Sequence, residues 1–393
     1  MLRNSVLMAI VVVLAIGPMS TAQDATQAAS TYQAWKNGVS NDSNFFPLAV
    51  WVQSPRNAER FKQAGINLYV GLWKGPTQQQ LSDLKQAHMP VICSQNDFGL
   101  NSSDADIIVG WMHGDEPDNA QARKSGDYGP PIEPSVIEEN YQRIRQRDAT
   151  RPVLLNLGQG VAYDNYIGRG VRRNHPEDYP KYVLGSDIVS FDIYPAVHDK
   201  PEVAGKLEFV ASGVERLRLW SNDEKIVWNC IECSRISNTS VKPTPQQIRS
   251  EVWMSLIKGS RGIIYFVHQF EPSFKEASLL DDQELLPAVT ALNRQITALA
   301  PVLNSPSVMD AVAKESLGES TLEFMCKRFA GGLYVFVANM ASENSAAQLR
   351  LMGPVSDSTR AIEIESGAAV ELRDSGFKVQ LPGYGIGLYR IDG

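Results

Sequence analysis

The alternation of strand-like and helix-like segments between residues 45 and 304 constrains the fold of this chain more than any other feature. Apolar runs typical of strands lie at 46–53, 66–73, 89–94, 107–114, 152–157, 187–194, 225–231 and 262–268. Amphipathic patterns at 57–64, 78–87, 134–147, 203–220, 245–258 and 286–302 predict helices between them, and the segments after the third and fifth strands have only weak helical patterns. Such alternation builds βα units around a parallel sheet. The sequence therefore predicts an α/β fold.

The number of strands and the absence of one motif select the type of α/β fold. Eight strands suit a closed (β/α)₈ TIM barrel better than an open doubly wound sheet. No Gly-x-Gly-x-x-Gly pattern follows the first strand, which disfavours a dinucleotide-binding fold. Thr77 and Thr244 stand where the side chain of a helix N-cap is expected, and Pro245 takes the first helical position.

After about residue 305 the pattern changes to short strands separated by turns. Strand-like segments lie at 321–326, 333–339, 346–351, 360–364, 369–372, 377–380 and 385–390, and Ala330-Gly331-Gly332 is typical of a turn. Short strands at this spacing predict an all-β sandwich. We therefore expect a barrel over 23–304 and a small C-terminal β-sandwich domain over 305–393.

The N-terminus has the features of a secretory signal peptide. Arg3 is followed by an apolar run at 6–17, which is short for a membrane span, and Ser20-Thr21-Ala22 is typical of a cleavage site. We expect a signal peptide at 1–22 and a secreted or periplasmic mature protein with no membrane association. The four cysteines do not show whether any pair, but buried free thiols are favoured because Cys230 and Cys233 would point to opposite faces of one strand.

The overall charge argues against one class of partner. The formal net charge of the 393-residue chain is -7. A nucleic-acid-binding protein usually has a basic face, so no nucleic-acid partner is expected. The oligomeric state does not follow from the sequence.

Two glutamates end predicted strands, which is where barrels place their chemistry. Glu116 follows the fourth strand and Glu232 ends the seventh. Two carboxyl groups facing each other across the mouth of a barrel can cleave a glycosidic bond, one as acid and one as nucleophile or base. Retention needs a separation of ~5 Å and inversion one of ~6.5–9.5 Å. Either glutamate alone could instead cap a helix or pair with an arginine.

This arrangement resembles the clan of retaining (β/α)₈-barrel glycoside hydrolases known as clan A. The resemblance implies that Glu116 is the acid/base and Glu232 the nucleophile, and that Tyr194, at the end of the sixth strand, donates a hydrogen bond to the nucleophile. That clan usually has Asn-Glu-Pro at the acid/base, whereas this chain has Asp115-Glu116-Pro117. An ionised Asp only accepts hydrogen bonds, and a neighbouring carboxylate raises the pKa of an acid. Asp115 therefore indicates an altered sugar preference or a more distant family.

Further polar and aromatic side chains are expected at the same rim. Period two puts Asp192 and Tyr194 on one face of the sixth strand, pointing into the barrel. An Asp inside a barrel needs a partner, for which Asn156 of the fifth strand or an Arg is a candidate. The predicted substrate-binding residues are Asp115, Tyr194, Trp73, Asn156, Asp192, Trp228, His268 and Gln269. Packing under the rim is the alternative role for each aromatic residue and for His268. Arg169, Arg172 and Arg173 could bind an acidic sugar or pair with neighbouring carboxylates.

Other functions are weighed against glycoside hydrolysis. A metal-dependent hydrolase needs several His ligands at strand ends, and only five His occur, so neither a metal nor an organic cofactor is expected. A serine hydrolase lacks its Gly-x-Ser-x-Gly motif. The main alternative is a non-catalytic carbohydrate-binding barrel. The sequence favours a glycoside hydrolase acting on an oligo- or polysaccharide, without revealing the sugar, the linkage or whether cleavage is internal or terminal.

Overall fold

The computed structural model describes residues 31–316, 319–356 and 358–393. In this part of the chain, a parallel sheet has the order β7-β6-β5-β4-β3-β2-β1-β9-β8. Its strands are β1 (Leu48–Trp51), β2 (Leu68–Val70), β3 (Val91–Ser94), β4 (Ile108–Met112), β5 (Val153–Leu157), β6 (Ile188–Phe191), β7 (Ile226–Val227), β8 (Asn229–Glu232) and β9 (Ile263–Phe266). Only Trp228 separates β7 from β8, so these two form one broken strand and the barrel has eight strand positions. A bridge between Asp192 and Cys230 links the two ends of the sheet. The predicted TIM barrel is confirmed.

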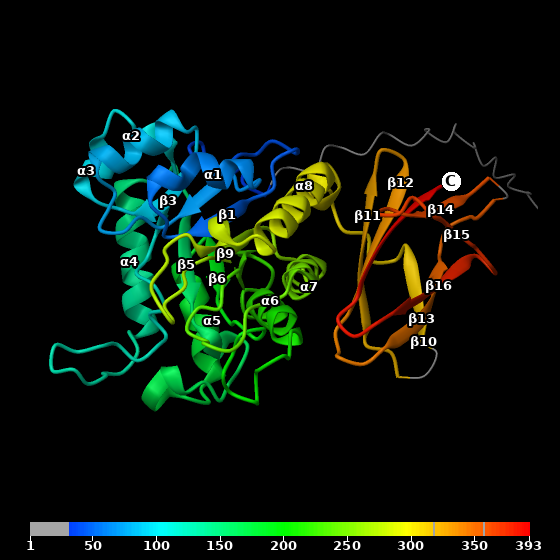
Figure 1. Ribbon diagram of the computed structural model, residues 1–393. Helices are drawn as coiled ribbons and strands as arrows, with labels where there is room; N and C mark the ends of the chain where they lie inside the picture. Colours follow the sequence, from blue (N-terminus) through cyan, green and yellow to red (C-terminus); the bar gives the residue numbers. More distant parts are fainter. Residues whose placement is uncertain (1–30, 317–318, 357) are drawn as a thin grey trace, which may run out of the picture.

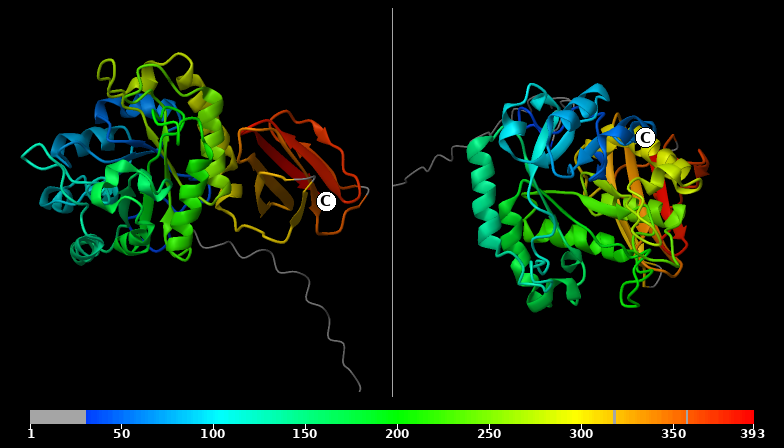
Figure 2. Two further views of the ribbon diagram at one scale, coloured as in Figure 1. Left: turned by 90° about the horizontal axis from the view of Figure 1, so that it is seen from below. Right: turned by 60° about the vertical axis from the view of Figure 1, so that its left-hand side comes forward.

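Helices surround the barrel (Figures 1 and 2). They are α1 (Ala58–Gln63), α2 (Gln78–Gln86), α3 (Asp97–Asn101), α4 (Pro134–Arg147), α5 (Tyr179–Tyr182), α6 (Glu208–Trp220), α7 (Pro245–Ile257) and α8 (Leu285–Asn304). Thr77 and Thr244 each complete a capping box with the Gln three residues later, as their positions predicted. The helices after the third and fifth strands are short, which agrees with their weak patterns.

Two antiparallel sheets form the C-terminal domain. One has the order β10-β13-β16, with β10 (Val312–Ser316), β13 (Ser345–Leu351) and β16 (Gly376–Leu381). The other has the order β11-β12-β17-β14-β15, with β11 (Leu322–Phe329), β12 (Gly332–Asn339), β17 (Ile386–Asp392), β14 (Arg360–Glu363) and β15 (Ala369–Val370). Apolar residues from both sheets form one buried cluster, so the expected all-β domain is confirmed. The sequence analysis missed β10.

The sandwich packs against α7 and α8 (Figure 2). The Trp253 ring of α7 lies 5.2 Å from the Phe336 ring of β12, measured between centroids. The Ser250 hydroxyl donates to the Tyr384 carbonyl at 2.6 Å, and the Tyr384 hydroxyl donates to Glu208 of α6 at 2.6 Å. Buried aromatic packing together with these hydrogen bonds fixes the sandwich to the side of the barrel.

The expected signal peptide at 1–22 lies outside the described residues and stays a prediction. No helix among the described residues is long and apolar enough to cross a lipid bilayer. All four cysteines are buried and free.

Candidate active site

Two carboxyl groups meet at the carboxyl ends of the strands. Glu116 follows β4 and Asp192 follows β6, and their side chains are hydrogen-bonded to each other. Both residues are partly exposed to solvent, although Oδ1 of Asp192 is buried. A substrate entering the barrel mouth can therefore reach both groups.

The backbone at Glu116 is in the left-handed region, with a φ of 42°. A residue with a Cβ adopts this conformation at a cost of roughly 1 kcal/mol, and such strain clusters at functional sites. The Glu116 amide donates to the Asn156 carbonyl of β5 at 3.2 Å, and its carboxyl accepts from Asn119 Nδ2 at 2.8 Å. The turn that follows β4 thus holds the Glu116 side chain toward β5 and β6.

Asn156 of β5 joins the carboxyl groups into one network. Its Nδ2 donates to Asp115 at 2.9 Å, and its Oδ1 accepts from the Ser190 hydroxyl of β6 at 2.8 Å. Asp115 lies at the solvent-exposed rim. Asn156 was predicted as a partner of Asp192, but it binds Asp115 instead, and Asp192 pairs with Glu116.

Burial and the charges of acidic neighbours raise the pKa of both paired carboxyl groups. Burial is the largest cause of the pKa of Glu116 lying well above its ordinary value, followed by the charge of Asp192 and their hydrogen bond. Burial also raises the pKa of Asp192 to about 7, while the hydrogen bonds from Glu116 and Tyr194 act to lower it. Two carboxyl groups that are hydrogen-bonded to each other share one proton near neutral pH, so that one is protonated while the other is a carboxylate. One protonated acid beside one carboxylate is the arrangement that glycoside hydrolysis needs.

Two tyrosines border the pair. Tyr194, two residues after Asp192, lies beside it and acts to lower the pKa of the Asp192 carboxyl group. Tyr166, in the loop after β5, lies close enough to Glu116 and Asp192 for their charges to raise its pKa, although burial is the larger cause. Tyr166 and Asn119 were missed as site residues, although both lie in long loops after strands, where site residues of barrels concentrate.

Glu232, predicted as the second catalytic carboxylate, lies elsewhere. Its side chain is fully buried, with an exposed fraction of 0%. Its Oε1 accepts from the Ala196 amide at 2.7 Å, and its further partners include Glu251 of α7, which is also fully buried. The structure thus brings Glu116 together with Asp192 and directs Glu232 toward α7. The nucleophilic role of Glu232 stays a prediction, and no solvent reaches its carboxyl group in this conformation.

The buried carboxyl pair of Glu232 and Glu251 should make the stability of the protein depend on pH. Burial raises the pKa of Glu232 from 4.5 to about 7, and burial and the charge of Glu232 raise that of Glu251 well above its ordinary value. Raised pKa values mean that this contribution to stability is complete below about pH 4.5 and is lost as the pH rises through about 7. Glu251→Gln should remove much of this decrease in the free energy of unfolding, which is on the order of a few kcal/mol.

Urea unfolding of the wild type and Glu251→Gln between pH 4.5 and 8 measures this effect. The variant should be the more stable protein at pH 8, and the two should converge toward pH 4.5. Glu224→Gln, at an exposed position before β7, is the control and should follow the wild type. Parallel pH curves for the wild type and Glu251→Gln would refute the role assigned to this buried pair.

The two predicted tryptophans have different environments. Trp228 is fully buried inside the barrel, where its Nε1 donates to the Tyr32 hydroxyl at 2.8 Å. It packs with residues such as Ile264 and Leu154, so the predicted rim position is corrected to one in the barrel core. Trp73, after β2, has an exposed fraction of 73%. Its ring is thus available to a ligand.

Aromatic side chains extend from the carboxyl pair to the surface along β9 and its loop. We call Tyr194, Phe266, His268, Phe270 and Phe274 the aromatic ladder. Its successive ring centroids lie 5.2, 5.2, 6.1 and 5.8 Å apart. The two outer rings, Phe270 and Phe274, are 44% and 64% exposed. The ladder therefore connects the site to an open apolar surface.

His268 and Gln269 help to shape this loop. His268 is buried, its Nε2 lies 3.2 Å from Gln53 Nε2, and its ring stacks on Phe270 at an interplanar angle of 11°. Gln269 Nε2 donates to the Ser273 carbonyl at 3.2 Å within the same loop. Both residues lie beside the mouth, where His268 supports the aromatic ladder and Gln269 holds the loop closed.

The arginine cluster after β5 pairs with neighbouring carboxylates. Arg169 is buried and binds Asp178 at 2.9 Å, and Arg172 binds the same Asp178 at 2.6 Å. Asp178 thus holds both guanidinium groups within the loop, whereas Arg173 forms no ion pair with the described residues. No group of three or more His, Cys, Asp or Glu side chains in the described part of the chain could hold a metal ion.

Comparisons with known proteins agree with the barrel. No family model matches the sequence. No curated protein matches it. Among solved structures, alpha-galactosidase I from Mortierella vinacea is similar with a TM-score of 0.54 at 9% identity, over 91% of this chain and 99% of that one. A putative alpha-galactosidase from Bacteroides fragilis has a TM-score of 0.50 at 10% identity, over 89% of this chain and 80% of that one.

A third similar structure is the alpha-amylase from Geobacillus thermoleovorans in complex with acarbose. Its TM-score is 0.50 at 10% identity, over 89% of this chain and 99% of that one. The three similarities concern the fold of the chain. At such low identity they establish the fold, and function has to be argued from the site.

Proposed function

We propose that this protein is an exported glycoside hydrolase that cleaves oligo- or polysaccharides with retention of configuration. The observation that carries the proposal is the hydrogen-bonded, solvent-accessible pair of Glu116 and Asp192 at the barrel mouth. Glu116 protonates the leaving oxygen, and Asp192 attacks the anomeric carbon to form a glycosyl-enzyme. Glu116 then deprotonates the water that releases the sugar.

The close approach of the two carboxyl groups supports retention. Retaining enzymes hold their carboxyl groups ~5–5.5 Å apart, whereas inverting enzymes leave ~6.5–9.5 Å for a water molecule. Groups that hydrogen-bond to each other lie nearer the first geometry. Tyr194 lies beside Asp192 and favours its ionised form, which suits a nucleophile, although the sequence had suggested Tyr194 as a partner of Glu232.

Export and carbohydrate binding belong to the same proposal. The signal-like segment at 1–22 supports secretion or a periplasmic location. The exposed Trp73 and the outer rings of the aromatic ladder offer flat apolar faces beside polar groups, which suits a sugar. A non-catalytic carbohydrate-binding barrel remains the competing proposal, because the aromatic rings alone would satisfy it.

The purified mature protein should release reducing sugar from at least one member of a panel of aryl glycosides and plant or bacterial polysaccharides. Proton NMR of the first-formed product should show the anomeric configuration of the substrate. Binding to a polysaccharide without hydrolysis would favour the non-catalytic barrel. An inverted first product would overturn the covalent mechanism.

The aromatic ladder should contribute more to the binding of long substrates than to the binding of short ones. Phe270→Ala together with Phe274→Ala should raise KM for an oligosaccharide about three- to tenfold per ring, since a stacked aromatic contact contributes ~0.5–1.5 kcal/mol. KM for an aryl monoglycoside should change little. Steady-state kinetics on both substrates checks this, with the half-exposed Phe329→Ala in the sandwich as control. Equal effects on both substrates would contradict a role in binding distant sugar units.

A further inference from the structure

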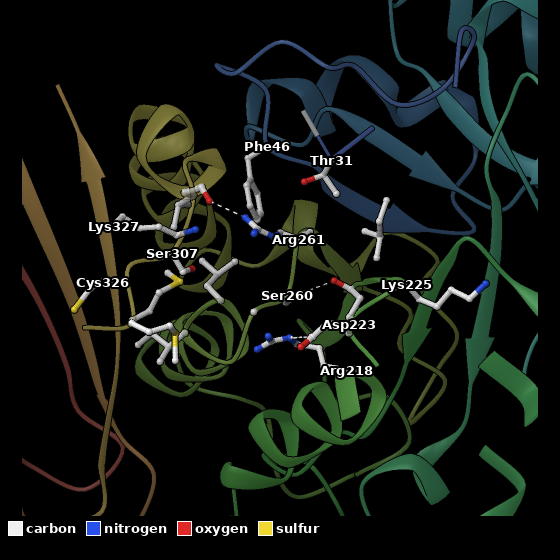
Figure 3. A pocket seen from close by; sticks show the side chains of 18 of the residues that line it. Thr31, Phe46, Arg218, Asp223, Lys225, Ser260, Arg261, Ser307, Cys326 and Lys327 are labelled. Carbon is white, nitrogen blue, oxygen red and sulfur yellow. Dashed lines mark hydrogen bonds and ion pairs between the residues drawn. The ribbon is translucent and has the colours of Figure 1, made fainter. Parts of the chain in front are cut away.

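A cavity lies at the opposite end of the barrel from the carboxyl pair. It has a volume of about 820 Å³ and is lined by residues that precede barrel strands, such as Phe46, Lys225 and Arg261, and by Ser307 and Lys327 of the C-terminal part of the chain. Figure 3 shows the Lys327 and Arg261 side chains directed toward one another from the two domains. The cavity is thus an interdomain space, where ligand sites commonly occur.

Two cations in this cavity have no carboxylate partner. Lys327 is 1% exposed, and its Nζ donates to the Ser305 carbonyl at 2.6 Å. Arg261 donates through its guanidinium to the Leu303 carbonyl at 2.9 Å. Within residues 31–316, 319–356 and 358–393, neither side chain forms an ion pair with a carboxylate. Buried charges are normally paired, so two unpaired cations on facing walls need an explanation.

The backbone carbonyls at the end of α8 only partly offset the positive charges of Lys327 and Arg261. They carry the negative end of the helix dipole and attract cations. Yet a Lys has three donors and an Arg has five, and each uses one in the hydrogen bonds above. Among the described residues the remaining donors of Lys327 and Arg261 have no acceptor, and Arg261 is partly exposed whereas Lys327 is covered.

Neighbouring positive charges make the charged form of Lys327 less favourable. Burial, followed by repulsion from Arg261 and Arg218, lowers the pKa of Lys327 to about 7. Arg218, the third cation on the cavity wall, is held by Asp223 at 2.6 Å.

The other acidic groups that line the cavity are engaged or exposed. Glu323 lies 3.8 Å from both Lys258 and Lys314. Asp187 accepts from the Tyr141 hydroxyl and the Val153 amide. Glu224 is exposed to solvent. The acids on the wall therefore leave Lys327 and Arg261 without a counter-charge.

We propose that this interdomain cavity binds a ligand through a sulfate or phosphate group held between Lys327 and Arg261. Such oxyanions match the multiple donors of these two side chains and supply the missing negative charge. The cavity is larger than one oxyanion, so it accommodates a larger molecule that carries the group. Because barrel and sandwich each contribute one cation, the ligand bridges the two domains. This site is independent of the proposed hydrolase activity.

Isothermal titration calorimetry with inorganic sulfate and inorganic phosphate tests the proposal, with chloride keeping the ionic strength constant. Wild-type protein should bind at least one of the two anions at a single site. Lys327→Met, which keeps the length of the side chain and removes its charge, should weaken binding by about tenfold or more, as expected for the loss of a charge-assisted hydrogen bond. Lys378→Met, at an exposed position on β16, should bind as the wild type does.

Thermal unfolding separates specific binding from the general stabilising effect of sulfate, which acts on any protein surface. Without sulfate, Lys327→Met should unfold at a higher temperature than the wild type because the buried charge is gone. With sulfate, the wild type should gain more than Lys327→Met. Arg261→Gln provides a second variant if Lys327→Met does not fold, and it should also lose binding. No saturable binding to the wild type, or equal binding by wild type and folded variants, would overturn the proposal.

Discussion

Glu116→Gln is expected to lower kcat on natural glycosides by roughly 10²–10⁴-fold, the usual contribution of a general acid. The amide cannot protonate a leaving alkoxide, although it keeps the size of the side chain and its contact with Asn119. An aryl glycoside with a highly acidic phenol needs no such proton, so formation of the glycosyl-enzyme from it should survive. The intermediate should then accumulate, because Gln cannot activate water.

Rapid-mixing kinetics with dinitrophenyl and alkyl glycosides of the same sugar measures this difference. The dinitrophenyl substrate should give a burst of phenol followed by slow turnover, and added azide should speed the slow phase because it attacks without a base. Glu133→Gln, at an exposed position before α4, is the matched control and should behave as the wild type. If Glu116→Gln slowed both substrates equally, the acid/base assignment would be wrong.

Asp192→Asn is expected to abolish turnover of every substrate, whatever its leaving group. Without the carboxylate no glycosyl-enzyme forms, and a loss on the order of 10⁴-fold or more follows from removing the nucleophile. This independence from the leaving group distinguishes Asp192 from Glu116. Asp199→Asn, in the same loop after β6 but exposed, should keep full activity.

Thermal unfolding of Asp192→Asn shows whether misfolding causes the loss of activity. The pKa values of Glu116 and Asp192 are both raised by burial and by acidic neighbours, so their charges destabilise the folded state at neutral pH. Asp192→Asn should therefore unfold at a temperature no lower than the wild type does. An inactive but markedly less stable variant would point to a structural role for Asp192.

Much of the fold and part of the site were predictable from the sequence because they depend on local pattern. Parallel strands bring their carboxyl ends to one rim, so Glu116, Asn156 and Asp192 had to approach each other once their strands were placed. Period two correctly put Asp192 and Tyr194 on the same face of one strand. The two Thr N-caps needed only their neighbours in sequence.

Glu232 and Trp228 were not predictable in the same way. The periodicity that puts Cys230 inside the barrel would also put Glu232 there, facing Glu116. Its carboxyl group instead accepts from the Ala196 amide, in the loop after β6, and contacts Glu251 of α7. These partners come from other βα units, so the pattern within the strand could not reveal them. Trp228 likewise depends on Tyr32, which is 196 residues away in sequence.

The most direct test of the account is to identify the side chain that carries the sugar in a trapped glycosyl-enzyme. The wild type would be incubated with an activated 2-deoxy-2-fluoro glycoside of the sugar found in the substrate screen, digested with trypsin and analysed by tandem mass spectrometry. Asp192 and Glu232 fall in different tryptic peptides, 182–206 and 226–235. We predict the added sugar on Asp192 in 182–206. A sugar attached to Glu232 in 226–235 would contradict the pair proposed from the structure and restore Glu232 as the nucleophile.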